Sequence, residues 1–163
     1  MVKLSWREKY AGILVLFIGI IFLVMQLASV FSNTSRPYAM QNGTFVVDKN
    51  EFLSDIKTYS LIIAGILAGW GLLKGKRLGW MLGVPILLFI TAVIGTITIE
   101  QVLKVKKFDN SMIGFCVGIF LLFLAILFLL LPSARQKYRV SKGVLILTLL
   151  LFVGLGGAYL FLQ

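Results

Sequence analysis

The fold of this chain is decided by the stretch Gly69-Trp70-Gly71-Leu72-Leu73-Lys74-Gly75-Lys76-Arg77-Leu78-Gly79-Trp80. Its three cationic residues separate two long apolar runs, and a tryptophan stands about one helical turn outside them on each side. Tryptophan, lysine and arginine are typical of the boundary between lipid and water. The stretch therefore predicts the turn of a helical hairpin at a membrane surface.

The composition agrees with a membrane environment. Of the 163 residues, 60% are hydrophobic and 13% are charged, whereas soluble domains carry roughly 45–50% apolar and about 25% charged residues. A soluble domain of this size could not bury the excess, because small domains expose much of their surface. The net charge of +10 comes mainly from segments that flank apolar runs, where cations set membrane topology. We expect an all-α, multi-pass membrane protein with no nucleic-acid partner.

Five apolar runs approach the length of about 20 residues that a helix needs to cross a bilayer. In a single domain, 1–163, they predict spans at about 11–31, 57–73, 78–99, 111–131 and 144–162, with an outer loop at 32–56. The first run is longer than the apolar core of a signal peptide, so we expect it to be retained. The second is short, because only Tyr59 to Leu73 precede the cations. It is interpreted as a crossing helix, and a re-entrant segment in a four-span protein stays open.

Lys and Arg are divided unequally between the two sides of this five-span topology. The richer side carries Lys3, Arg7, Lys9, Lys74, Lys76, Arg77, Arg135, Lys137, Arg139 and Lys142. The other side carries Arg36, Lys49, Lys57, Lys104, Lys106 and Lys107. The positive-inside rule then predicts a cytoplasmic N-terminus and an outer C-terminus. The charge bias favours a bacterial cytoplasmic membrane.

Small residues recur at four-residue spacing in three of the predicted spans. The GxxxG pairs are Gly65 and Gly69, Gly79 and Gly83, and Gly114 and Gly118. Two helix backbones can approach closely at such positions, so packing inside the chain's own bundle and an interface with another subunit both stay open. The half-helix Ile119–Leu131 is all Leu, Ile and Phe except for Ala125, which favours lipid contact on most of its sides.

A polar track is a second pattern, in the third predicted span. Thr91 and Thr98 share a face with Gly95, and Glu100 follows at the end. Threonines in membrane helices commonly bond their own backbone, and we favour that interpretation over a solute pathway. No Asp, Glu, Lys or Arg lies near the middle of a predicted span, which argues against an ion-coupled carrier.

The sequence carries little that could support catalysis. Glu51 and Asp55 lie one helical turn apart and could act as acid and base or hold a cation, but no metal motif or nucleophile–base pair accompanies them. The chain contains no His, and Cys116 is its only cysteine. We therefore expect no catalytic residue, no metal site and no cofactor, and we do not expect an enzyme.

The remaining candidates lie in the two basic turns of the predicted hairpins. They are Lys74, Lys76, Arg77, Arg135, Lys137, Arg139 and Lys142. Cations at this depth attract anionic lipid headgroups on the cytoplasmic side, or they could contact an acidic partner. The leading functional hypothesis is a non-catalytic membrane subunit or accessory protein that acts through helix packing with other subunits or its own copies. A pore or passive transport component for a small solute or lipid, and an enzyme acting on a lipid-linked substrate, are the alternatives.

Overall fold

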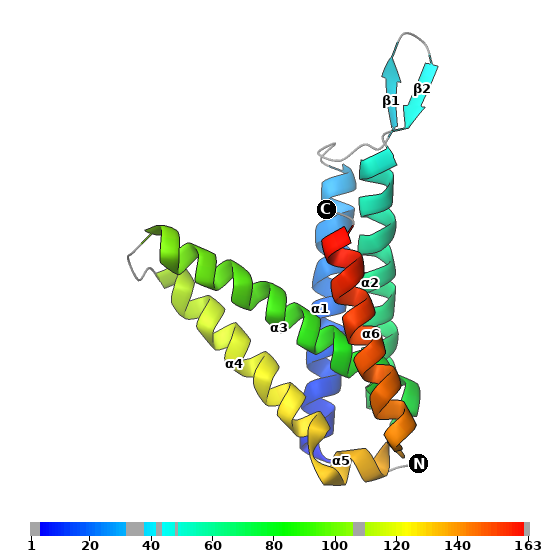
Figure 1. The fold of residues 1–163 in the computed structure, drawn as a ribbon, viewed down its shortest axis with the longest axis vertical. Helices are drawn as coiled ribbons and strands as arrows, with labels where there is room; N and C mark the ends of the chain where they lie inside the picture. Colours follow the sequence, from blue (N-terminus) through cyan, green and yellow to red (C-terminus); the bar gives the residue numbers. More distant parts are fainter. Residues whose placement is uncertain (1–3, 32–37, 42–43, 48, 106–109, 162–163) are drawn as a thin grey trace.

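The computed structural model describes residues 4–31, 38–41, 44–47, 49–105 and 110–161. Within these ranges the chain is helical apart from one two-stranded hairpin (Figure 1). The elements are α1 (Trp6–Phe31), β1 (Tyr38–Gln41), β2 (Thr44–Val47), α2 (Lys49–Leu73), α3 (Arg77–Val105), α4 (Asn110–Leu130), α5 (Pro132–Lys137) and α6 (Lys142–Phe161). Residues 32–37, 42–43 and 48 of the predicted outer loop lie outside the described residues.

Four helices are long and apolar enough to cross a membrane, which fits the multi-pass protein that the composition predicts. The crossing segments are Trp6–Ser29, Asp55–Leu73, Arg77–Glu100 and Ile113–Leu130. The short second run gains its length from α2, a continuous helix of 25 residues whose polar first turns precede the apolar part. The apolar stretch of α6, Lys142–Ala158, is shorter than the other four, so the fifth span stays a prediction.

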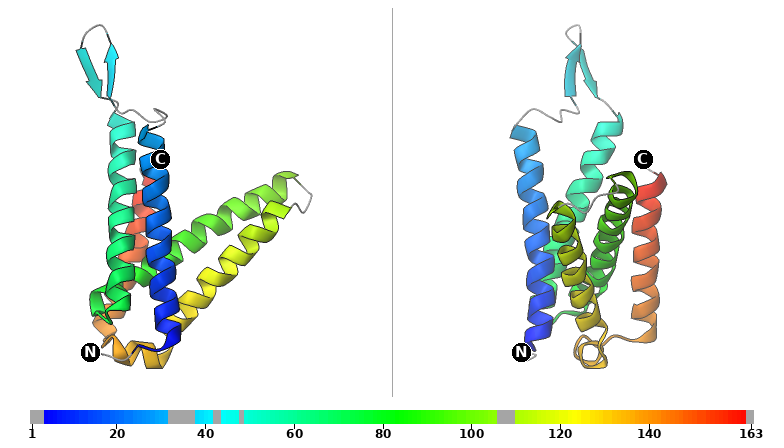
Figure 2. Two further views of the ribbon diagram at one scale, coloured as in Figure 1. Left: turned by 180° about the vertical axis from the view of Figure 1, so that it is seen from behind. Right: turned by 90° about the vertical axis from the view of Figure 1, so that its left-hand side faces the viewer.

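The helices form two hairpins and one further helix. The antiparallel helices α1 and α2 stand side by side, and the strands β1 and β2 extend beyond them (Figure 1). The second hairpin, α3 and α4, leans away from this pair, and α6 packs on α3 (Figure 2). All of these units converge at one end of the molecule, where α1 begins, α2 turns into α3, and α5 joins α4 to α6.

Glycines allow α1 and α2 to pack closely. A methyl group at Gly69 would lie 2.6 Å from the backbone nitrogen of Leu16, and one at Gly19 would lie 3.1 Å from that of Ile66. Real Cβ atoms essentially never come as near as the first of these distances, and the second is tighter than most real contacts. Close backbone approach of this kind supplies the van der Waals contact that holds helices together in lipid.

The turn between α2 and α3 is built by three further glycines. Gly75 has a φ of 66°, in the left-handed region that favours glycine. The backbone nitrogen of Lys76 donates to the Gly71 carbonyl at 2.8 Å, and that of Gly75 donates to the Leu72 carbonyl at 3.0 Å. This pair of bonds is the Schellman motif, which ends a helix. Directly beyond it, a methyl group at Gly79 would lie 2.2 Å from the carbonyl carbon of Gly71, so the hairpin closes backbone to backbone.

The two tryptophans that flank this turn have different environments. Trp70 is 47% exposed on the last turns of α2, as expected for an interfacial residue. Trp80 is 0% exposed, and its indole Nε1 donates to the Leu129 carbonyl at 2.9 Å. The expectation that both rings sit at the lipid boundary is therefore wrong for Trp80, because this indole finds its acceptor inside the protein, where it ties α3 to the end of α4.

The apolar half of α4 is only partly exposed. Its buried positions are Leu122, Ala125, Ile126 and Leu129. They follow the spacing of one helical face, and α4 packs on α3 and α1. Phe120, Phe123 and Leu127 are exposed. The predicted lipid contact on most sides of this half-helix is therefore wrong for its buried face, which belongs to the core.

Candidate functional site

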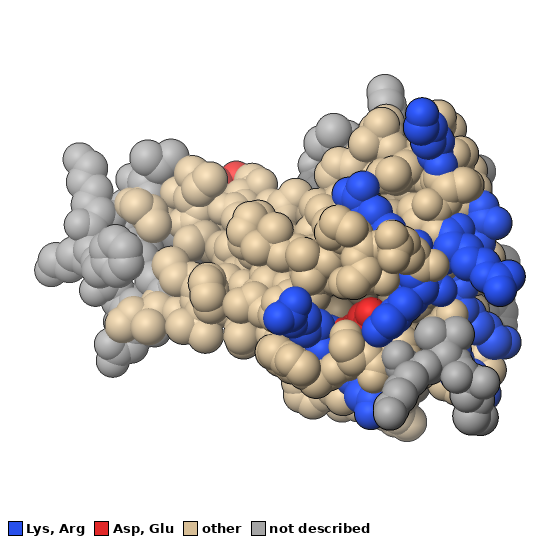
Figure 3. Space-filling model, turned by 90° about the horizontal axis from the view of Figure 1, so that it is seen from below, with Lys and Arg blue, Asp and Glu red and all other residues tan. Residues whose placement is uncertain are grey.

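Cationic side chains gather at the end of the molecule where the helices converge (Figure 3). We call this surface the basic end and define it by Arg7, Lys9, Lys74, Lys76, Arg77, Arg135, Lys137, Arg139 and Lys142. Among the residues whose side chains are described, Lys57 is the one Lys or Arg that does not belong to the basic end. It lies toward the opposite end of α2. The concentration of positive charge makes this end the candidate functional site.

The two basic turns meet, as expected if the hairpins are neighbours. The Tyr138 hydroxyl donates to the Leu72 carbonyl in the last turn of α2 at 3.0 Å, and this bond is buried. Arg77 Nη2 lies 3.4 Å from Ser141 Oγ. The first contact satisfies a carbonyl at a helix end, and both connect the α2–α3 turn to the segment between α5 and α6.

A buried carboxylate lies within the basic end. Glu8 is 2% exposed, and both of its oxygens lie 3.0 Å from Lys137 Nζ. Glu8 Oε2 also accepts a hydrogen bond of 2.7 Å from the backbone nitrogen of Ser5. One carboxylate therefore caps the start of α1 and binds α5 by an ion pair.

This role of Glu8 was not predicted from the sequence. The available signal was the run Ser5-Trp6-Arg7-Glu8, which matches the S-x-x-E capping box that starts many helices. Nothing in the sequence indicates the second partner, because Lys137 lies 129 residues further along the chain.

Tyr138 is also affected by this carboxylate. Burial raises the pKa of the Tyr138 hydroxyl above its ordinary value of about 10, and the negative charge of Glu8 raises this pKa further. The phenol is 1% exposed. It is therefore held in its protonated form, in which it can donate to the Leu72 carbonyl.

The raised pKa predicts a pH dependence of stability. Below about pH 10 Tyr138 is protonated in both the folded and the unfolded chain, so its contribution to stability is complete. Above that pH the unfolded chain ionises first, and the free energy of unfolding falls as the pH rises. We expect Tyr138→Phe to be less stable by about 1 kcal/mol at pH 8, with the difference shrinking at pH 11. Unfolding titrations of both proteins at the two pH values check this, and a constant difference would contradict it.

One indole ring organises the cations at the end of α2. Lys74 Nζ lies 3.9 Å from the centroid of the Trp70 ring, and Lys76 Nζ lies 5.3 Å from it. Both distances are within the range of cation–π attraction. The two lysines are exposed, so their ammonium groups stand beside one exposed ring at the surface.

The threonine hydroxyls of the predicted polar track form hydrogen bonds within their own helix. Thr91 Oγ1 donates to the Leu87 carbonyl, and Thr98 Oγ1 to the Ile94 carbonyl, each at 2.7 Å and within α3. Glu100 is exposed near the end of that helix. These bonds agree with our preference for backbone bonding over a solute pathway.

The carboxylates considered for catalysis are not brought together as a site. Asp55 Oδ1 accepts a hydrogen bond of 3.1 Å from Gln26 Nε2 on α1, whereas the side chain of Glu51 lies outside the described residues. Within the described part of the chain, no group of three or more His, Cys, Asp or Glu could hold a metal ion. Asp55 therefore connects α1 to α2.

The predicted packing glycines fall into two groups. A methyl group at Gly69, Gly79 or Gly83 would come within 2.8 Å of an atom of another helix of this chain, and one at Gly65 would lie 3.7 Å from Gly19. A methyl group at Gly114 or Gly118 would meet nothing within 4 Å. The first group lies in contacts inside the bundle, and the second faces open space.

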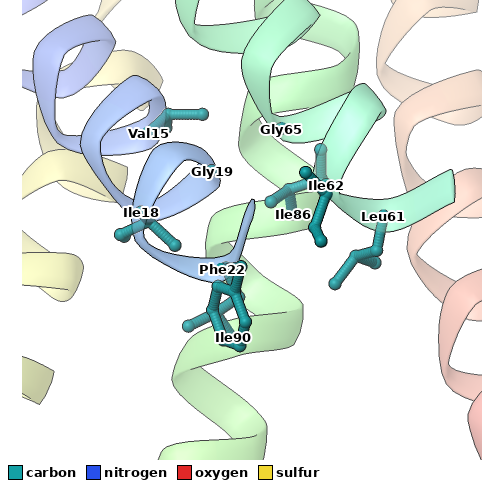
Figure 4. A pocket seen from close by; sticks show the side chains of 9 residues that line it. All are labelled: Val15, Ile18, Gly19, Phe22, Leu61, Ile62, Gly65, Ile86 and Ile90. Carbon is teal, nitrogen blue, oxygen red and sulfur yellow. The ribbon is translucent and has the colours of Figure 1, made fainter. Parts of the chain in front are cut away.

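A small crevice lies between α1, α2 and α3 (Figure 4). It is lined by Val15, Ile18, Gly19, Phe22, Leu61, Ile62, Gly65, Ile86 and Ile90. Binding sites for polar ligands place a few polar groups in an apolar wall, and this lining has no polar side chain. The crevice therefore offers nothing that would orient a polar substrate.

No protein-family model, curated protein or solved structure matches this chain. Evidence about its function therefore comes from the geometry of its own residues. That geometry comprises a connected basic end, a core closed by glycines, and a glycine face on α4 that its own bundle leaves uncovered.

Proposed function

We propose that this protein is a non-catalytic membrane subunit or accessory protein that binds another membrane helix through α4. The observation that carries the proposal is the difference between its two groups of glycines. Gly114 and Gly118 lie one turn apart on α4, and a methyl group at either position would meet no atom of the described residues within 4 Å. The partner helix belongs to another subunit or to a second copy of this chain.

Glycine within a helix carries a cost in stability that close packing can offset. Glycine destabilises a helix interior by about 1 kcal/mol relative to alanine. At Gly69 and Gly79 close packing against a neighbouring backbone offsets this cost. At Gly114 and Gly118 the described chain supplies no such contact, whereas a partner helix would. The exposed apolar residues Ile113 and Val117 lie on the same turns of α4 and would extend the contact.

We place the basic end in the cytoplasm. Positive charge is retained on the cytoplasmic side of membrane proteins, and the start of α1, the α2–α3 turn and α5 all lie at this end. With α6 as a fifth span, the C-terminus lies outside. The same charge bias supports our proposal of a bacterial cytoplasmic membrane.

The pore and the enzyme receive less support from the geometry. The hydroxyls of Thr91 and Thr98 are engaged by their own helix, and the crevice between α1, α2 and α3 is apolar. Flux of small solutes into liposomes that contain the purified chain would favour the pore. Loss of function in cells carrying Asp55→Asn or Glu100→Gln, with normal amounts of protein, would favour the enzyme.

Purification at native expression tests the proposed subunit role. We expect the chain to co-purify with a membrane partner or with itself in mild detergent, as seen by mass spectrometry and by differently tagged copies. The double variant Gly114→Leu/Gly118→Leu should reduce the recovered partner by about tenfold. The two isobutyl groups would hold the helices apart and weaken the free energy of association by more than about 1.4 kcal/mol.

The matched control is Phe123→Leu/Leu127→Ile, which changes exposed apolar residues on another face of α4 and adds no bulk at the glycines. It should retain the partner. A monodisperse monomer with no partner at native expression would overturn the proposal, as would equal recovery from the glycine variant and the control.

A further inference from the structure

The turn between α2 and α3 holds two positive charges close together. The ammonium groups of Lys74 and Lys76 lie 3.9 and 5.3 Å from the centroid of the same Trp70 ring. The indole attracts each of them, but the two like charges repel one another. An anion between the two ammonium groups would remove this repulsion and bind to both.

The described part of the chain supplies no such anion. Glu8, the acidic residue at the basic end, is buried and engaged by Lys137. Asp55 begins the crossing segment that ends at Leu73, so it lies about 27 Å away along α2 at about 1.5 Å of rise per residue. Glu100 lies toward the far end of α3. The counter-ion of the two lysines therefore comes from outside the described chain.

Three other cations of the basic end are less suited to an external anion, and Arg7 lies alone over the Phe128 ring, 5.8 Å from its centroid. Lys137 is held by Glu8, and Arg77 contacts Ser141. Arg135 has a buried Nε without a hydrogen-bond partner among the described residues, and a headgroup outside the protein cannot reach that atom. Lys74 and Lys76 instead combine exposure with a fixed position at the ring.

We propose that Trp70, Lys74 and Lys76 bind the phosphate of an anionic phospholipid headgroup. Trp70 lies in the last turns of a crossing segment and is 47% exposed. An indole in this position prefers the depth of the lipid headgroups, so the ammonium groups at its face stand at the level of the lipid phosphates. This site is independent of the proposed subunit role, which concerns α4.

Quenching of tryptophan fluorescence by brominated lipids tests the site directly. The background variant Trp6→Phe removes the other exposed indole, and Trp80 is fully buried, so the quenching reports contact with Trp70. The protein is placed in phosphatidylcholine bilayers with a fixed fraction of brominated phosphatidylglycerol or brominated phosphatidylcholine. The relative association constant of the anionic lipid is expected to exceed one by several-fold, and Lys74→Gln/Lys76→Gln should return it to about one.

The matched control is Arg139→Gln/Lys142→Gln, which removes the same charge from two exposed residues of the same end. It should keep most of the preference, since these residues make no described contact with the Trp70 ring. Equal effects of the two double variants would overturn the site in favour of diffuse attraction by the whole surface. Loss of the preference on addition of inorganic phosphate, but not of chloride at equal ionic strength, would identify soluble phosphate as the ligand and overturn the lipid assignment.

Discussion

Gly79→Ala is expected to destabilise the protein by about 3 kcal/mol or more, at the upper end of the usual range for one substitution. The new Cβ would lie 2.2 Å from the Gly71 carbonyl carbon and equally close to the Leu72 backbone nitrogen. Neither atom belongs to a side chain that can rotate away. The two helices must therefore separate, which weakens the packing of the α2–α3 hairpin and the fit of Trp80 beside it.

The matched control is Gly95→Ala in the same helix, where a methyl group would meet nothing within 4 Å. It should change the free energy of unfolding by less than about 1 kcal/mol, toward greater stability, because alanine forms helices better than glycine. Denaturant unfolding in mixed micelles, followed by circular dichroism, measures both variants. Equal stability of Gly79→Ala and Gly95→Ala would show that the Gly71–Gly79 contact is not required.

Glu8→Ala is expected to cost about 2–3 kcal/mol. It removes the acceptor for the Ser5 backbone nitrogen, a cap worth about 1 kcal/mol, and it removes the counter-charge of Lys137. Breaking a fully buried ion pair costs about 3–5 kcal/mol. Lys137 is 32% exposed, so its remaining charge can be hydrated and the loss is smaller.

Glu8→Gln separates the two contributions, since glutamine can still accept from Ser5 but carries no charge. We expect it to be more stable than Glu8→Ala by about 1 kcal/mol. A double-mutant cycle with Lys137→Gln should give a coupling energy of about 1–2 kcal/mol. Lys142→Gln, a change at an exposed cation, should be neutral. A coupling energy of zero would mean that the ion pair does not hold α5 to α1.

The overall class of the protein could be predicted from composition because the bilayer selects long apolar helices. The runs predicted at 11–31, 57–73, 78–99 and 111–131 each overlap a helix long enough to cross. The turn at residues 74–77 was predicted from its charges and flanking tryptophans, and the structure has a turn there, between α2 and α3. That the two basic turns meet depends on how distant helices pack, which the sequence pattern does not give.

The packing of α4 could not be predicted, because nearly every residue of Ile119–Leu131 is apolar. A helix without polar residues has no periodicity to distinguish its buried face from its lipid face. The same limit applies to the glycines. Gly79-xxx-Gly83 and Gly114-xxx-Gly118 have the same spacing, yet one pair is packed within the chain and the other is open.

By itself, the sequence determined that the chain belongs in a membrane, where the turn between α2 and α3 lies, and which segments carry the positive charge. These properties depend on residues close together along the chain, so local composition is sufficient. Only the tertiary structure decided that Glu8 pairs with Lys137, that Trp80 is buried while Trp70 is exposed, and which glycines are covered. These properties depend on the angles at which distant helices cross, and those angles follow from the packing of the whole bundle.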